Sequence, residues 1–307
     1  MLNRVTNLTM SANAQRTLQT QQSRLAELQE KATTLNKISR PSDDPAATAQ
    51  ALETRSLLAA NAQYGRNIGD GNTWLTAADS ALEQATNVMH RVKDLTVQAG
   101  NDSLSQSGKD AIAAELEALK TDLVSIANTQ HLGRNIFAGS SDAAGAFTPG
   151  TPRDPSIPSD TGTPPSFNGA GTNPVERRIS ATQTVRVDAD GAVIFGNGSG
   201  SVFDIVSKIA ADLRTGTDIA PRSADVEAAF KNIVNGRAEI GTRQAQLERA
   251  SSVNSDLEAT LDAQKTGIEK ADLGSVIMDL KLQETNYQVA LAATARVLQP
   301  TLMDFLR

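Results

Sequence analysis

The segment Phe195–Ser201 comes nearest, of all parts of this sequence, to a site of chemistry. It reads Phe-Gly-Asn-Gly-Ser-Gly-Ser and lies between a predicted strand and a predicted helix, which is the setting of a dinucleotide-binding loop. However, Ser201 stands where the last glycine is needed, the preceding strand belongs to a predicted hairpin, and no later strand supplies an acid for the ribose. The segment therefore predicts a loop rather than a nucleotide site.

Other signals for a ligand site are incomplete. Residues 108–110, Gly-Lys-Asp, lack the upstream glycine and the hydroxyl of a phosphate loop. Residues 188–191, Asp-Ala-Asp-Gly, begin like a calcium loop without its closing glutamate. His90 and His131 have no companions at ligand spacing, and there is no cysteine. We expect no metal, no cofactor and no enzyme, because catalysis needs several converging groups.

Composition narrows the class of partner. The 307 residues carry a net charge of −6, which argues against nucleic acid, and no apolar run is flanked by a basic cluster or long enough to span a membrane. The first residues form no continuous apolar segment, so we expect no cleaved secretory signal. We also expect no small-molecule substrate.

Aromatic residues make up only 3% of the sequence. Six of the seven phenylalanines lie between Phe137 and Phe230, which predicts a compact core in that part of the chain.

Both ends of the chain carry apolar residues at the alternating three-and-four spacing of a coiled coil. The positions of this assembly seam are Leu18, Leu25, Leu28 and Leu35 near the start, and Leu273, Ile277, Leu280, Tyr287, Leu291 and Leu298 near the end. The same helix faces also carry the polar residues Gln21, Glu284 and Thr294. A larger bundle offers such side chains more hydrogen-bond partners than a single pair of helices does. We therefore predict arms that pack together and against other copies, while the central helices form an internal core.

A helix start is predicted between the first arm and the centre. Residues Arg40, Pro41, Ser42, Asp43, Asp44 and Pro45 interrupt the arm. Asp44 is the expected N-cap, Pro45 the first helical residue, and Asp43 adds negative charge at the positive helix end. We expect the new helix to break at residues 67–72, followed by helices over Leu75–Val92 and Ile112–Ile126.

The middle of the chain predicts a small β-rich part. Seven of the eleven prolines lie between Pro149 and Pro174, which predicts a long exposed loop with polyproline character. Strands are expected at Arg178–Val187 and Ala192–Phe195, joined by a hairpin turn at residues 188–191. Helices then return at Ser201–Leu213 and from Asp225 to about residue 264, before the terminal arm.

These elements predict a mainly α fold: a long helical hairpin or bundle with coiled-coil-like terminal arms and a small β-rich insert domain. We divide it into terminal arms (1–44 with 268–307), a helical bundle (45–138 with 208–267) and a β-rich, Pro/Gly-rich outer domain (139–207).

Three stretches resemble the flagellin superfamily of axial proteins, and most closely its hook-associated protein 3, or hook–filament junction, family. They are residues 23–30 (Ser-Arg-Leu-Ala-Glu-Leu-Gln-Glu) with 40–47, residues 128–139 with Gly133-Arg134 and Phe137-Ala138-Gly139, and the ending 298–307. Residues 35–37, Leu-Asn-Lys, depart from the Gly-Lys pair that family members commonly carry.

The resemblance implies a structural protein of the bacterial flagellum. Such a chain is exported unfolded by the flagellar type III apparatus without signal cleavage, after being held by an export chaperone. It then forms a ring between hook-associated protein 1 and the first flagellin subunits. Its arms line the axial tube, its bundle surrounds them, and its β-rich insert faces outward, outside the cell.

Two alternatives stay open at this stage. One is a filament flagellin, which would give an open-ended polymer in vitro. The other is an unrelated cytoplasmic coiled-coil scaffold, whose termini would be folded and protease-resistant in the monomer.

Overall fold

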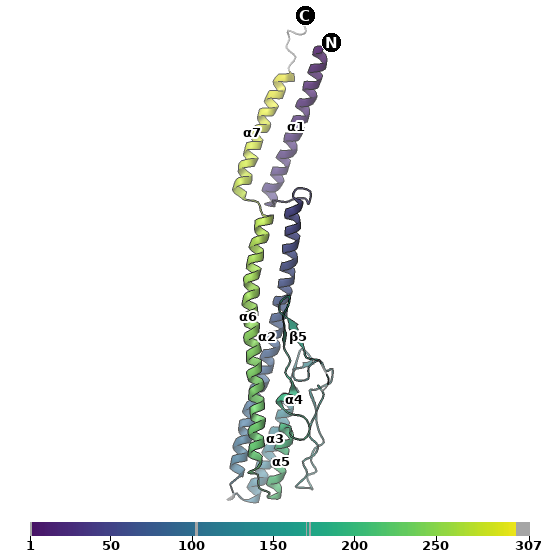
Figure 1. Ribbon diagram of the computed structural model, residues 1–307. Coiled ribbons are helices and arrows are strands. Elements are labelled where there is room, and N and C mark those ends of the chain that lie inside the picture. The colour runs from purple at the N-terminus through teal and green to yellow at the C-terminus, as the bar shows by residue number, and fades with distance from the viewer. Residues whose placement is uncertain (1, 102–103, 170, 172, 299–307) are drawn as a thin grey trace. The chain divides into compact units, whose positions relative to one another are not determined.

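The computed structural model describes residues 2–101, 104–169, 171 and 173–298. Its elements are the helices α1 (Leu2–Thr34), α2 (Pro45–Ala99), α3 (Gln106–Ala127), α4 (Gly191–Ile194), α5 (Val202–Thr215), α6 (Arg222–Glu269) and α7 (Leu273–Leu298), and the strands β1 (Gln130–His131), β2 (Arg134–Asn135), β3 (Phe147–Thr148), β4 (Ser166–Phe167), β5 (Glu176–Arg178) and β6 (Thr184–Arg186). The strands form three antiparallel pairs of consecutive strands. The mainly α fold with a small β part is as the sequence predicts (Figure 1).

The chain divides into two compact units. We call Met1–Ala60 with Leu257–Arg307 the arm unit, and Asn61–Asp256 the bundle unit. The helices α2 and α6 contribute to both units. The division into three domains drawn from the sequence stays an interpretation.

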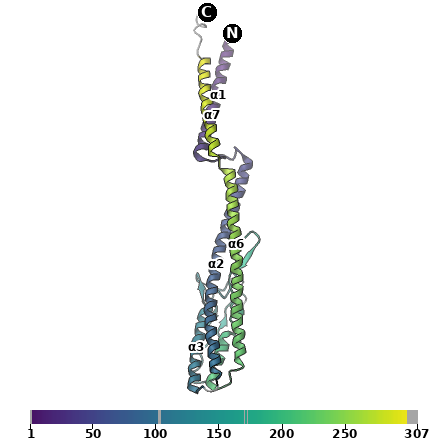
Figure 2. The same ribbon diagram turned by 90° about the vertical axis from the view of Figure 1, so that its left-hand side faces the viewer.

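The core of the bundle unit is built on one face of α2. Its predicted apolar positions, Leu75, Ala78, Leu82, Ala85, Met89 and Val92, are all fully buried. They pack in one continuous core with residues of α3, α5 and α6, and Figure 2 shows α2, α3 and α6 side by side. A stripe of this width is what a helix needs to bury one side against several neighbours.

Phenylalanines hold the β-rich part on this core. Phe137 lies edge-on to Phe195, with ring centres 5.3 Å apart, and Phe147 contacts Phe203 at 5.1 Å. All four side chains are buried. Each ring buries a large area and prefers such edge contacts. The predicted aromatic core therefore holds the short strands against the helices, although these strands form no large sheet.

Three local predictions are wrong, one in α2 and two around the expected hairpin. The expected break at residues 67–72 is absent, because α2 continues through Gly69 and Gly71. Gly71 is buried so closely against Val187 and Leu247 that a Cβ would lie 3.1 and 3.2 Å from them. Close packing at this point outweighs the weak helix propensity of glycine.

The second error concerns the expected strand at Ala192–Phe195. Residues 191–194 form the short helix α4. The single strand expected at Arg178–Val187 is also wrong, because residues 179–183 connect the strands β5 and β6, and the hairpin therefore lies earlier than expected. The Asp190 carboxylate accepts hydrogen bonds from the Ala192 and Val193 amides, at 3.0 and 3.4 Å. This side chain caps a helix, so the Asp-Gly pair starts a helix here instead of turning a hairpin.

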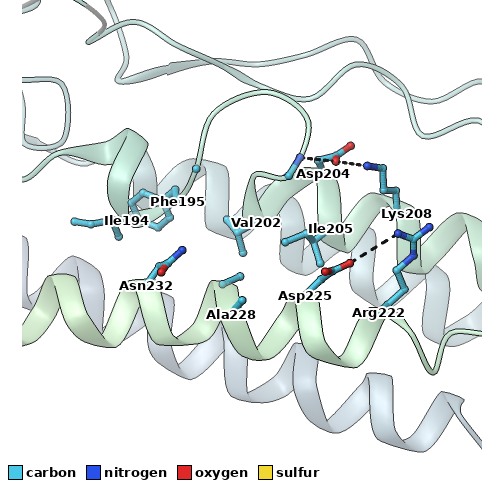
Figure 3. A pocket seen from close by; sticks show the side chains of 13 residues that line it. Ile194, Phe195, Val202, Asp204, Ile205, Lys208, Arg222, Asp225, Ala228 and Asn232 are labelled. Carbon is cyan, nitrogen blue, oxygen red and sulfur yellow. Dashed lines mark hydrogen bonds and ion pairs between the residues drawn. The ribbon is translucent and has the colours of Figure 1, made fainter.

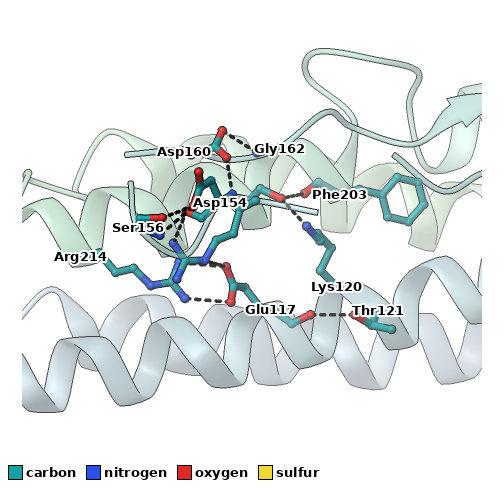
Figure 4. A network of polar contacts seen from close by, with 11 residues as sticks. Glu117, Lys120, Thr121, Asp154, Ser156, Asp160, Gly162, Phe203 and Arg214 are labelled. Atoms are coloured by element: carbon teal, nitrogen blue, oxygen red, sulfur yellow. Dashed lines mark hydrogen bonds and ion pairs between the residues drawn. The ribbon is translucent and has the colours of Figure 1, made fainter. Parts of the chain in front are cut away.

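The proline-rich loop is more ordered than an exposed loop with polyproline character would be. Its two sides meet where the Thr151 amide donates to Thr163 Oγ1 at 2.7 Å, beyond the β3–β4 pair. Arg153 forms an ion pair with Glu117 of α3 at 2.9 Å, and Glu117 also pairs with Arg214 of α5 (Figure 4). Hydrogen bonds from the Ser156 hydroxyl and the Ser156 amide lower the pKa of the Asp154 carboxyl. The loop is therefore pinned to the helices at its base.

In the arm unit, α1 and α7 lie side by side and antiparallel (Figure 1). Both helices end at one joint, where the Lys37 amide donates to the Glu269 carbonyl at 2.7 Å and the Ala271 amide to the Leu35 carbonyl at 2.9 Å. Leu35 adopts a φ of 55° at this point. The Glu269 carboxylate accepts from Arg55 of α2 at 2.6 Å, which lowers its pKa.

Gly69 and Gly71 provide a matched pair of substitutions. A Cβ added at Gly69 would meet no other group within 4 Å, so Gly69→Ala is expected to stabilise the protein by about 0.5–1 kcal/mol through helix propensity. Gly71→Ala is expected to be less stable than Gly69→Ala by about 1–3 kcal/mol, because its methyl group overpacks buried side chains. Denaturant unfolding of both variants measures the difference. Equal stabilisation by both would contradict the packing explanation for the continuous helix.

The Arg55–Glu269 pair predicts a pH dependence. Because the pKa of Glu269 is lowered in the folded state, its contribution to stability is present above the ordinary glutamate pKa and is lost as the pH falls through the folded-state value. The melting-temperature difference between the unmodified chain and Glu269→Gln is therefore expected to be largest near neutral pH and to vanish in acid. Glu258→Gln, an exposed position on the same helix, serves as the control and is expected to show no such trend.

Candidate assembly surfaces

The glycine-rich loop at residues 195–201 does not form a phosphate site. Ser201 is the N-cap of α5, as expected for a helix beginning there, and the Gly200 amide donates to the Asp204 carboxylate at 2.9 Å. Lys208 pairs with the same carboxylate at 2.7 Å (Figure 3). An internal anion already occupies this end of the loop and would repel a phosphate.

A hollow of about 210 Å³ lies beneath this loop, between α5 and α6. Its apolar side includes Phe195, Val202 and Ile205, and Arg222 with Asp225 stands at one end (Figure 3). These charges pair with each other at 3.8 Å, and Arg222 also bonds Asp212 at 2.9 Å. The groups that could hold a ligand are thus bonded to one another.

The other candidate residues for chemistry have structural partners. The buried Asp188 carboxylate bonds Arg186 through both oxygens, at 2.9 and 2.8 Å, which raises the pKa of that arginine. His131 lies edge-on to Trp74, and His90 contacts Phe230. Among the residues that the structure describes, no group of three acidic, histidine or cysteine side chains could hold a metal ion. None of the described helices combines the length and apolar character needed to cross a lipid bilayer.

The motif at residues 40–45 starts α2 as the sequence indicates. The Ala47 amide donates to Asp44 Oδ1 at 2.9 Å, and Pro45 is the first helical residue. The Arg40 amide donates to Asp43 Oδ2 at 2.9 Å. Asp43 thus closes the turn while Asp44 caps the helix. The motif therefore connects the joint after α1 to the start of α2.

The seam residues of α1 lie on the face that meets α7. Leu18, Leu25 and Leu28 are half-buried, as is Leu35 at the joint. Gln21 is on the same stripe, and Gln283 of α7 donates to the Gln21 carbonyl at 3.2 Å and to its side-chain oxygen. A paired amide of this kind favours one register of two helices.

The predicted seam of α7 falls on two sides of that helix. On the side of α1, Val276 and Gln283 are buried and Leu280 and Tyr287 are half-buried, whereas Leu273, Ile277 and Leu291 are exposed. The exposed fractions of Ile277 and Leu291 are 51% and 43%. The side chain of Leu298 lies outside the described residues. The assembly role of all these positions stays a prediction.

A further apolar face of α7 is not among the predicted positions. Met278, Leu282 and Val289 are exposed, Met278 to 72%. Their spacing of four and seven residues places them on one side of a helix. This second apolar stripe can be found in the sequence, but the prediction considered only one stripe on this helix. Together with Leu273, Ile277 and Leu291, these residues leave α7 with apolar surface beyond its contact with α1.

The arrangement is suited to protein–protein contact rather than to chemistry. Exposed apolar surface rimmed by polar residues marks an interaction site. Each candidate group for ligand chemistry described above is tied to a structural partner. The surfaces of α7 are therefore the candidate functional site.

Two family models match the helical ends of the chain. The bacterial flagellin N-terminal helical region matches residues 5–142, and the bacterial flagellin C-terminal helical region matches residues 224–306. Together they cover more than half of the chain and include α7 and all but the first three residues of α1. This membership excludes the unrelated coiled-coil scaffold.

Individual relatives agree with these models. Flagellar hook-associated protein 3 of Salmonella typhimurium is 26% identical over 289 residues, which cover 86% of this chain and 87% of the relative. Among solved structures, a putative flagellar hook-associated protein of Vibrio parahaemolyticus has a TM-score of 0.62 at 19% identity, covering 74% of this chain and 100% of the other. The flagellar junction protein of Legionella pneumophila has a TM-score of 0.55 at 17% identity, covering 72% and 99%. The chain belongs to the flagellin family, and over most of its length it is similar to flagellar hook-associated protein 3.

Proposed function

We propose that this chain is a non-enzymatic structural subunit of the bacterial flagellum that forms the junction between hook and filament. The similarity to hook-associated protein 3 over most of both chains carries this proposal, and the flagellin family models match both helical ends of the chain. The exposed apolar faces of α7 support it, because a subunit that must contact several neighbours needs more than one such face.

The finer assignment follows the same similarity. We propose that copies of this chain form a ring outside the cell, with hook-associated protein 1 on one side and flagellin on the other. Before that the chain is held by an export chaperone and passes through the flagellar export apparatus without loss of a signal peptide. A structural ring of this kind needs no cofactor, and its specificity comes from surfaces of different shape on its two sides.

The experiment that tests the proposal is deletion of the gene, with electron microscopy of the cells and analysis of the medium. We expect hooks without filaments, with flagellin shed into the medium. If the chain were a filament flagellin instead, the purified protein would form an open-ended polymer, and tagged copies would be found along the filament rather than at its base.

A charge on α7 should separate assembly from folding. Leu291→Asp places a carboxylate on an exposed face, so the melting temperature of the monomer and its secretion are expected to stay unchanged. In the assembled ring the same charge would be buried unpaired, which costs several kcal/mol per subunit. We therefore expect filaments that detach from the hook.

Leu280→Asp is the matched control for this variant. Leu280 is half-buried on the side of α1, so its substitution should already weaken the pairing of α1 with α7 in the monomer. A lower monomer melting temperature for Leu291→Asp would show that Leu291 belongs to an internal core, and the assembly interpretation of this face would fail.

The proline-rich loop is expected to be dispensable. Replacing residues 150–163 by two glycines removes the Arg153–Glu117 pair, while Glu117 keeps Arg214 and the aromatic core stays intact. Shortening a surface loop costs little closure entropy, so swimming and secretion should persist. Phe147→Ala, in the adjoining strand, should destabilise the protein by about 3–5 kcal/mol. Loss of filaments with normal secretion of the shortened chain would reveal an assembly role for the loop.

A further inference from the structure

Leu132 occupies an unfavourable position for a leucine. It lies in the two-residue turn between β1 and β2, with a φ of 51°, and Gly133 follows with a φ of 75°. Such turns favour Asn-Gly, because a leucine Cβ is strained at positive φ. At 80%, Leu132 is also the most exposed large hydrophobic side chain among the residues that the structure describes.

Among the described residues, Leu132 belongs neither to the hydrophobic core nor to the side chains packed against it, so core packing offsets neither cost. Leu35 also has a positive φ, but it is half-buried and its carbonyl accepts from Ala271 at the joint. At Leu132 the turn itself is held firmly, since Gln130 donates to the Ala144 carbonyl at 2.8 Å and His131 packs on Trp74. A rigid turn thus presents an apolar side chain to the outside. Strain that the fold does not need is a reason to look for a contact outside the chain.

The bundle unit also carries a hollow suited to such a side chain. It measures about 280 Å³ and lies between α4 and α6, lined on its apolar side by Ala189, Val193, Ile194 and Ile240. Val193, at its edge, is 66% exposed. The hollow is smaller than most pockets for small ligands, which range from about 300 to 1,000 Å³, so a single side chain fits it better than a cofactor does.

The charged groups around this hollow are already bonded. Arg186 pairs with Asp188, Asp190 caps α4, and Arg243 pairs with Glu239 while donating to the Asp188 carbonyl at 2.7 Å. A charged guest would find no free partner among them, whereas an aliphatic one finds an apolar wall. The amides of Asn232 and Asn235 stand at the same hollow and can bond the peptide groups of a turn.

We propose that Leu132 of one subunit inserts into the hollow between α4 and α6 of a second copy of this chain. The inference rests on the proposed function, in which copies stand side by side in a ring. Because the inserted residue and the hollow are different surfaces of one chain, the contact is head-to-tail, and contacts of that kind close into rings when the rotation allows. The proposal thereby names one lateral contact of the ring.

The absence of native cysteine makes this contact testable by cross-linking. In the Leu132→Cys/Val193→Cys double variant, mild oxidation of isolated hook–filament junctions should give a ladder of disulfide-linked dimers and larger species. A disulfide forms where the two Cβ atoms come within about 3.5–4.5 Å of each other, and the proposed insertion brings residue 132 of one copy to the edge of the hollow at residue 193 of the next. Either single variant should give no ladder, because a 132–132 or 193–193 bond stops at a dimer.

The outcomes are distinguishable. Assembled junctions without a ladder, or a ladder from Leu132→Cys/Ala228→Cys, which tests the neighbouring hollow between α5 and α6, would overturn the contact and leave the proposed function intact. Absence of the unmodified chain from the junction, measured by immunoelectron microscopy, would instead overturn the proposed function.

Leu132→Asn provides an independent test. Asparagine tolerates the left-handed backbone, so the variant's melting temperature should rise by about 2–4 °C, while filaments should detach at lower shear. Ile157→Asn, an exposed change in the proline-rich loop, should leave attachment unchanged. A fall in the melting temperature of Leu132→Asn, or unchanged attachment, would show that Leu132 has no such role.

Discussion

The reciprocal amide pair between Asn61 and Asn254 is the contact on which the register of the two longest helices depends. Asn61 is buried; its side chain donates to the Asn254 carbonyl at 2.9 Å, and the Asn254 side chain returns bonds to the Asn61 carbonyl and Oδ1 at 3.0 and 2.7 Å. A shift of α6 against α2 would leave the buried Asn61 side chain unpaired, at a cost of about 1–3 kcal/mol. With the register held, Arg237 reaches Asp79 and Lys93 reaches Glu227 in the same unit.

Polar and apolar groups have different tasks in this protein. Ion pairs link neighbouring helices or pin loops to them, as Glu117 does for Arg153 and Arg214. Surface pairs of this kind contribute little stability each, but they use up the charges that could otherwise hold a ligand. The apolar side chains that stay exposed, above all on α7, are the ones that do not pack in the core. This division suits a structural subunit, whose activity is contact with its neighbours.

The two leucines with left-handed backbone show how strain can be interpreted. At Leu35 the conformation ends α1 and allows the backbone bonds that join it to the start of α7, so the fold itself accounts for it. At Leu132 the same conformation serves a turn that glycine or asparagine would make more easily. The difference is burial: a strained residue that packs internally is explained by folding, whereas a strained and exposed one calls for an external contact.

Much of this architecture is determined by local sequence. The Asp44-Pro45 helix start, the Ser201 cap, the buried stripe of α2 and the half-buried leucines of α1 follow from periodicity and capping, which depend on residues a few positions apart. The family resemblance rests on the same local segments. These features agree with the structure because each depends on interactions between residues that are close together in the sequence.

Tertiary contacts decided those features for which local sequence preferences favour no single structure strongly. The helix α2 continues through Gly69 and Gly71 because the close packing of Gly71 against Val187 and Leu247 offsets a propensity penalty of about 1 kcal/mol per glycine. Which side of α7 meets α1 was likewise undecided, since this helix carries apolar residues on several sides and only the paired partner selects among them. Long-range burial is worth more than local propensity, and the sequence of one helix does not contain the surface against which it packs.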